Sequence, residues 1–174
     1  MYFNHNQTGI LIIDLQEKLI PAIHEGAKVV RQVRRLVEFA QLLQLPVLVT
    51  EQLPQKLGPT VPELRTIESW PIPLSKSTFS AAPILPGSLP KFLLVVGVET
   101  HVCIRQTVFD LTQKKQDLCI VGDAVGSRNP IDHDLALSEM RSLGIRIASL
   151  EAIAFEMLGS AEHPLFRSAL AIFK

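Results

Sequence analysis

The stretch FLLVVGVETHVC, residues 92–103, is the clearest indication of the fold in this sequence. Its first seven residues, 92–98, form an apolar run, which is typical of a strand buried between two layers of helices. A helix is predicted to follow from about Thr100 to Lys115. The polar residues between the two elements therefore lie at the carboxyl end of a strand, where open parallel sheets bind their ligands.

The same alternation of strands and helices extends to both sides of this stretch. Further elements are predicted at residues 8–13 (strand), 26–45 (helix), 47–50 (strand), 117–122 (strand), about 129–143 (helix) and 145–149 (strand), followed by two helical segments. Residues 51–90 hold eight of the twelve prolines and are expected to be irregular. This order predicts a three-layer α/β/α, Rossmann-like fold, in which helices cover both faces of a parallel sheet of about six strands. Residues 1–174 are expected to form a single domain.

Composition excludes several classes of protein. Of the 174 residues, 47% are hydrophobic and 20% are charged, which is ordinary for a globular protein. Lys and Arg number 17 and Asp and Glu number 17, so the excess of cations that non-specific nucleic-acid binding needs is missing. No apolar stretch approaches the ~20 residues of a membrane helix, and no signal peptide is recognisable. We expect a cytoplasmic protein that binds neither nucleic acid nor membrane and, given its apolar content, forms a homo-oligomer.

Five places near predicted strand ends carry polar side chains. They are Asp14, Thr50-Glu51, Lys76 in PLSKSTFS, residues 99–103 and Asp123. Because the carboxyl ends of parallel strands share one edge of the sheet, these side chains are candidates for a common site.

Cys103 is the most informative of these residues. If Thr100 is the N-cap of the predicted helix, the Cys103 sulfur lies near the helix N-terminus. The helix dipole and the free N–H groups there favour a thiolate, and the same N–H groups could hold an oxyanion. The alternative is that Cys103 is a small buried hydrophobic residue.

Asp14 and Lys76 each have a functional and a structural interpretation. Asp14 could take a proton from a thiol, or it could be an ordinary turn residue after a strand. Lys76 could polarise a substrate carbonyl or hold Asp14 beside a thiolate, or it could be an exposed surface lysine.

The order of these motifs resembles that of the isochorismatase-like cysteine hydrolases. The motifs are DLQ at 14–16, the lysine of SKSTFS at 75–80, and GVETHVC at 97–103. The resemblance extends from Thr8 to about Phe155. The superfamily includes nicotinamidases and N-carbamoylsarcosine amidases, and the string TEQLPQKLGPTVPEL is similar to the isochorismatase domain-containing subgroup.

The resemblance implies a catalytic triad of Asp14, Lys76 and Cys103. In such enzymes the cysteine attacks a carbonyl carbon, the aspartate accepts the thiol proton, and the lysine orients the aspartate and stabilises charge. A thioester forms, and water hydrolyses it. The family also has a cis peptide, which would fall between Val98 and Glu99 and would aim the backbone N–H groups of Glu99 and Cys103 at an oxyanion.

Two departures from the family narrow the expected chemistry. Nicotinamidases carry metal-binding histidines in the region that corresponds to residues 50–64, and this sequence has none there. We therefore expect no metal and no other cofactor, and nicotinamide is disfavoured as a substrate. Isochorismatases of siderophore pathways lack the nucleophilic cysteine, so Cys103 favours hydrolysis of a C–N bond in a small amide-like molecule.

Four further residues are candidates for a substrate pocket, namely Gln16, Glu51, Phe79 and Thr100. For Gln16 the alternative is a hydrogen bond within a turn, and for Glu51 it is a solvated position at a strand end. Core packing is favoured for Phe79, as it is for Trp70.

Other polar residues are interpreted as structural. Asp123 is expected to join Ser127 and Arg128 in a hydrogen-bonded cluster. His101 could act in acid–base steps, but it is expected to face outward from the first helical turn or toward a neighbouring subunit. Four other histidines are assigned to surface or capping positions, namely His5, His24, His133 and His163.

Two functions from other classes compete with hydrolysis. The chain could be a non-catalytic binding or scaffold protein that has kept the fold. It could also sense oxidants through Cys103, although Cys119 is expected to lie too deep in the core to form a disulfide with it.

Overall fold

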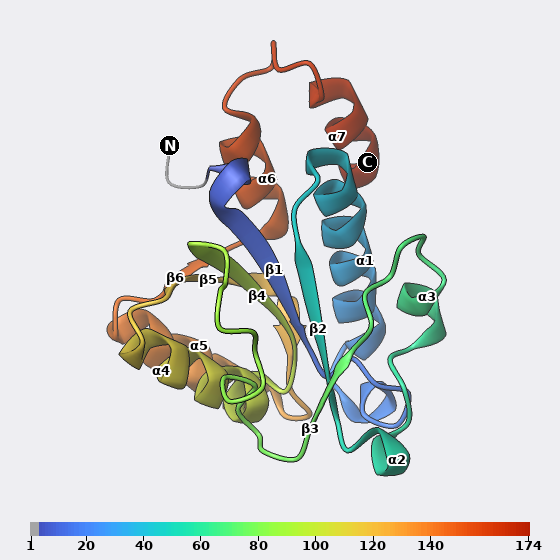
Figure 1. The fold of residues 1–174 in the computed structure, drawn as a ribbon, viewed down its shortest axis with the longest axis vertical. Helices are drawn as coiled ribbons and strands as arrows, with labels where there is room; N and C mark the ends of the chain where they lie inside the picture. The colour runs from blue at the N-terminus through green and yellow to red at the C-terminus, as the bar shows by residue number, and fades with distance from the viewer. Residues whose placement is uncertain (1–3) are drawn as a thin grey trace.

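A six-stranded parallel sheet forms the middle layer of the protein in the computed structural model, which describes residues 4–174 (Figure 1). The strand order is β3-β2-β1-β4-β5-β6, so that β1 lies inside the sheet. The strands are β1 (Thr8–Ile13), β2 (Val47–Gln52), β3 (Leu74–Lys76), β4 (Phe92–Val98), β5 (Asp117–Gly126) and β6 (Arg146–Ala148). The predicted six-stranded α/β architecture is confirmed.

Helices cover both faces of this sheet, as predicted (Figure 1). One layer contains α1 (Gly26–Leu43), α6 (Leu150–Leu158) and α7 (Phe166–Phe173), and the other contains α4 (Arg105–Gln113) and α5 (Pro130–Ser142). Ile10 and Ile12 pack into the first core cluster, whereas Leu11 and Ile13 pack into the second. Because both faces of the strand are buried, an uninterrupted apolar run is what such a strand requires.

The remaining elements are short. They are the 3₁₀ turns η1 (His5–Gln7) and η2 (Ile20–Ala22), the helices α2 (Pro54–Leu57) and α3 (Pro62–Arg65), and the π-helical turn η3 (Thr100–Ile104). No helix within residues 4–174 is long and apolar enough to cross a membrane.

Several boundaries differ from the sequence predictions. Strand β3 lies inside the proline-rich stretch that was expected to be irregular, where its three residues are too few for a periodic pattern. Helix α1 ends at Leu43 because Gln44 adopts a left-handed conformation with φ of 57°. Strand β5 continues to Gly126, four residues beyond its expected end, and β2 continues to Gln52.

The topology places the candidate site at a switch point. From β1 the chain moves outward to β2 and β3, and it then returns to β4 on the other side of β1. In open α/β sheets, the crevice between two such oppositely directed connections is where ligands bind. Asp14 follows β1 and Glu99 follows β4, so both lie at this point.

Candidate active site

Asp14 lies directly after β1 with its side chain fully buried. Its φ of 55° is left-handed, a conformation that aspartate tolerates better than most residues. The backbone N–H of Asp14 donates to the Thr50 carbonyl (3.1 Å). Oδ1 accepts from the Thr50 hydroxyl (2.8 Å), and Oδ2 accepts from Nζ of Lys76 (2.6 Å). The carboxylate is thus fixed by β2 on one oxygen and by β3 on the other.

Lys76 ends β3, and its side chain is also fully buried. Besides Asp14, its ammonium donates to Gln52 Oε1 (2.7 Å) and to the carbonyls of Phe79 (3.0 Å) and Thr78 (3.3 Å). Four acceptors therefore surround three N–H groups. The interpretation of Lys76 as an exposed surface lysine is wrong, because the protein replaces all of its water contacts.

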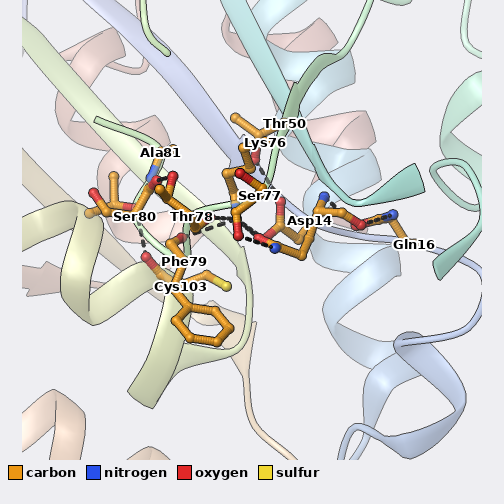
Figure 2. Close-up of polar contacts among 12 residues, drawn as sticks. Asp14, Gln16, Thr50, Lys76, Ser77, Thr78, Phe79, Ser80, Ala81 and Cys103 are labelled. Carbon is orange, nitrogen blue, oxygen red and sulfur yellow. Dashed lines mark hydrogen bonds and ion pairs between the residues drawn. The ribbon is translucent and has the colours of Figure 1, made fainter. Parts of the chain in front are cut away.

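Cys103 belongs to η3, the turn between β4 and α4, and is 7% exposed. Its sulfur is turned toward the Asp14–Lys76 pair (Figure 2). The N-cap of the turn is Glu99 and not Thr100, so that Cys103 is the fourth residue of the turn. The Val98–Glu99 peptide bond is cis, at the position to which the resemblance points.

The surroundings of the Cys103 thiol favour its neutral form. Burial raises its pKa to about 12, the negative charge of Asp14 acts in the same direction, and the charge of Lys76 opposes them. Burial and the neighbouring carboxylate thus oppose the thiolate that the helix N-terminus is expected to favour. Burial also raises the pKa of the Asp14 carboxyl, while Lys76 and the Thr50 hydroxyl hold it down.

Two of the four pocket candidates use their polar groups within the chain. The Gln16 amide donates to the carbonyls of Gln52 (3.0 Å) and Gly58 (2.7 Å), and its oxygen accepts from the Gln52 N–H (2.7 Å). Glu51 Oε1 accepts from the N–H (2.6 Å) and the hydroxyl (2.8 Å) of Thr60. These contacts tie the loop after β2 to the sheet and favour a structural role for both side chains.

The other two candidates lie closer to Cys103. Thr100 is buried, and its hydroxyl is 2.9 Å from Nδ1 of His133. Phe79 is 54% exposed, so the expected core packing of Phe79 is wrong. Trp70, by contrast, packs against the core cluster beside α1.

The supporting roles of three residues were not predicted from the sequence, although Thr50 was already a candidate at a strand end. Thr50 holds Asp14, Gln52 holds Lys76, and the Thr107 hydroxyl donates to the Cys103 carbonyl (2.6 Å). Thr50 and Gln52 did carry a signal, since polar residues two apart on a buried strand face the same side. Thr107 carried none, because a threonine inside a predicted helix is common.

The expected cluster of Asp123, Ser127 and Arg128 does not form. Asp123 accepts hydrogen bonds from Gln32 Nε2 (2.6 Å) and from the N–H of Leu150 (2.8 Å) at the start of α6. Ser127 and Arg128 instead bind the segment that carries Cys103.

Three side-chain contacts hold that segment from the β5–α5 side. Ser127 Oγ is 3.0 Å from Nδ1 of His101, Arg128 forms an ion pair with Glu99 (2.9 Å), and Thr100 bonds His133 as described above. His133 is half-buried, and burial lowers the pKa of its imidazole, so the surface position assigned to it is wrong.

Metal ligands do not come together in the described part of the chain. Among residues 4–174, no group of three His, Cys, Asp or Glu side chains is arranged so that it could hold a metal ion. The chemistry that the site offers is that of a thiol, a carboxylate and an ammonium.

The chain is similar to known proteins over most of its length. The isochorismatase domain matches residues 8–152. Isochorismatase domain-containing protein 2A of Mus musculus is 36% identical over 170 residues, which cover 95% of this chain and 82% of that protein. The structure of MAR1 ribonuclease from Caenorhabditis elegans superposes with a TM-score of 0.91 at 32% identity, covering 99% of this chain and 92% of that one.

A more distant structure shares the fold. It is an octameric hydrolase of unknown specificity from Escherichia coli, with a TM-score of 0.82 at 22% identity over 98% of this chain and 88% of that one. The domain match spans most of the chain, and the mouse relative exceeds 30% identity over 95% of this chain and 82% of its own length. The chain therefore belongs to the isochorismatase-like hydrolase family.

Proposed function

We propose that this protein hydrolyses a small amide-like substrate through a thioester on Cys103, with Asp14 and Lys76 completing a catalytic triad. The observation that carries the proposal is the fully buried ion pair of Asp14 and Lys76 beside an almost buried thiol, at the switch point of the sheet. A buried ion pair is costly, and perturbed titratable groups at such a point are typical of active sites.

In the first half of the reaction, Cys103 Sγ bonds to the carbonyl carbon of the substrate. Because the pKa of the thiol is raised to about 12, its proton leaves only as the sulfur attacks, and the Asp14 carboxylate accepts it. The carbonyl oxygen becomes an oxyanion, which the backbone N–H groups of Glu99 and Cys103 would bind. Asp14 then gives the proton to the nitrogen, the C–N bond breaks and the amine leaves.

In the second half, water attacks the thioester carbon and Asp14 takes a proton from the water. The C–S bond breaks, the acid is released, and the proton returns from Asp14 to the sulfur. Lys76 holds Asp14 at 2.6 Å, while burial raises the pKa of that carboxyl and helps it to carry a proton between steps.

The competing functions have less support. Oxidant sensing requires an accessible thiol of low pKa, whereas burial raises the pKa of both Cys103 and Cys119 to about 12. A scaffold has no need of a buried ammonium beside a thiol. The Caenorhabditis elegans relative is called a ribonuclease, but this chain has a formal net charge of zero, which favours a small neutral substrate over RNA.

The test is a panel of small amides, carbamoyl compounds and esters, with RNA as a parallel substrate. We expect one or more amides to be hydrolysed and a brief incubation to add the acyl mass to the Cys103 peptide. Cys103→Ala should abolish both results, and Cys119→Ala serves as the matched control, which should keep them. Turnover that survives Cys103→Ala, or cleavage of RNA without cleavage of any amide, would overturn the proposal.

We also propose that the protein acts as a homo-oligomer in a reducing compartment such as the cytoplasm. Both cysteines are free, and α5 exposes two large apolar side chains, Ile131 (66%) and Leu135 (64%), which a second copy could cover. Light scattering after size-exclusion chromatography should give a multiple of 19.3 kDa, and a monomer would contradict this.

A further inference from the structure

We propose that Thr107 is a positioning residue that joins the loop around Lys76 to the turn that carries Cys103. This inference rests on the proposed function, because it concerns the geometry of the proposed triad. The two halves of the triad come from distant parts of the chain, and Thr107 is fully buried between them.

The Thr107 hydroxyl makes two hydrogen bonds of opposite direction. It donates to the carbonyl of Cys103 (2.6 Å), and it accepts from the N–H of Ala81 (2.9 Å), which is also fully buried. One oxygen atom therefore links the backbone of Cys103 to Ala81, in the loop that follows Lys76.

That loop, residues 77–82, surrounds the ammonium group. Its carbonyls at Thr78 and Phe79 accept from Nζ of Lys76, and the Thr78 hydroxyl donates to the Ser80 carbonyl (2.8 Å). A shift of the loop at Ala81 would thus be passed to the carbonyls that hold Lys76 (Figure 2). The bond to Thr107 fixes where this loop lies relative to Cys103.

Thr112 provides a natural comparison on the same helix. Its hydroxyl donates to the carbonyl four residues earlier, that of Val108 (2.7 Å), as the Thr107 hydroxyl does with Cys103. This local bond is common for threonine in helices and positions nothing by itself. What distinguishes Thr107 is the second bond, to the loop.

The first experiment compares Thr107→Val, Thr107→Ser and Thr112→Val with wild type in steady-state hydrolysis of the amide found in the panel. We expect Thr107→Val to lower kcat by about 10- to 100-fold while KM changes less than about threefold, because small misplacements of reacting groups cost rate. Thr107→Ser keeps the hydroxyl and should retain most of the wild-type kcat. Thr112→Val should match wild type.

A second experiment needs no substrate. In an Asp14→Asn background, the charge of Lys76 acts on the Cys103 thiolate without the opposing charge of Asp14. Alkylation of Cys103 by iodoacetamide is then measured as a function of pH by peptide mass spectrometry. Adding Thr107→Val should loosen the loop, withdraw Lys76 and raise the midpoint of alkylation by about half a pH unit or more. Adding Thr112→Val should not move the midpoint.

These outcomes separate the two proposals. If no amide is hydrolysed by wild type, the proposed function fails, and the alkylation profile still tests Thr107. Wild-type kcat and an unmoved midpoint in folded Thr107→Val would overturn the positioning role. A loss of kcat in Thr107→Ser equal to that in Thr107→Val would also overturn it. If Thr107→Val does not fold, Thr107→Ala takes its place in both experiments.

Discussion

Lys76 exchanges all of its water contacts for four protein acceptors, of which one, Asp14, carries a charge. Removing either member should destabilise the protein, because the other is then a buried charge without its counter-ion. The same arrangement holds the carboxylate still beside the thiol. Stability and the proposed chemistry therefore both involve one contact of 2.6 Å.

Replacement of Lys76 by methionine tests the stabilising part of this contact. Lys76→Met should lower the free energy of unfolding at neutral pH by about 3–5 kcal/mol, since it leaves a buried carboxylate unpaired. Without the charge and hydrogen bond of Lys76, the pKa of Asp14 should rise further. Urea unfolding followed by circular dichroism measures the change.

The control for this variant is the double substitution Lys76→Met with Asp14→Asn. It removes both charges, so it should recover part of the lost stability. A double variant that is as unstable as the sum of the two single variants would show that the charges do not act as a pair.

Residue roles were only partly predictable from the sequence. Asp14, Lys76 and Cys103 could be named through the resemblance, because their motifs stand in order along the chain. The burial of Lys76 and the raised pKa of the Cys103 thiol could not, because both depend on what packs around these groups. For Gln16 the sequence left two interpretations open, a pocket residue and a hydrogen bond within a turn. Its side chain instead bonds the distant residues Gln52 and Gly58, which the sequence could not indicate.

At the scale of elements, the close approach of β4 to β1 depends on a glycine. Gly97 has φ of +115°, and a Cβ at that position would lie 2.0 Å from the carbonyl oxygen of Ile13, the residue before Asp14. Residues other than glycine rarely adopt this φ, and a side chain at position 97 would collide with the backbone of Ile13. The ends of β1 and β4, and with them Asp14 and the turn of Cys103, meet because this position lacks a side chain.

Gly97→Ala should therefore destabilise the protein by about 3 kcal/mol or more and also reduce hydrolysis in whatever fraction folds. Gly87→Ala is the matched control, since nothing lies within 4 Å of its added Cβ, and it should stay close to wild type. Thermal unfolding of the three proteins gives the comparison. Equal stabilities for the two variants would contradict this account of the strand ends.

The long elements were predictable because buried strands and amphipathic helices leave periodic patterns. The short ones were not. Strand β3 has three residues and follows Pro73, so nothing in the sequence distinguishes it from the irregular stretch around it. The π-helical turn η3 was predicted as the first turn of an ordinary helix, since its residues are compatible with either.

At the scale of the whole molecule, the two buried thiols make the free energy of unfolding vary with pH in the alkaline range. Unfolded thiols ionise near pH 8.5, whereas the pKa of both Cys103 and Cys119 is raised to about 12 in the folded protein. Between these values the unfolded state has lost protons that the folded state keeps. Stability should therefore fall as pH rises, by up to about 1.4 kcal/mol per pH unit for each thiol.

Urea midpoints between pH 8 and pH 10.5 measure this dependence. The slope should be steeper in wild type than in Cys119→Ala, which lacks one of the two groups. Parallel slopes would indicate that the Cys119 thiol ionises equally easily in both states.

The rate of Cys103 alkylation against pH shows whether Asp14, Lys76 and Cys103 act as one coupled group. We expect slow alkylation at pH 7–9 in wild type. In Asp14→Asn, the negative charge that raises the thiol pKa is gone and the cation that lowers it remains, so alkylation should rise at lower pH. Superimposed profiles for wild type and folded Asp14→Asn would contradict the coupling on which the proposed catalysis depends.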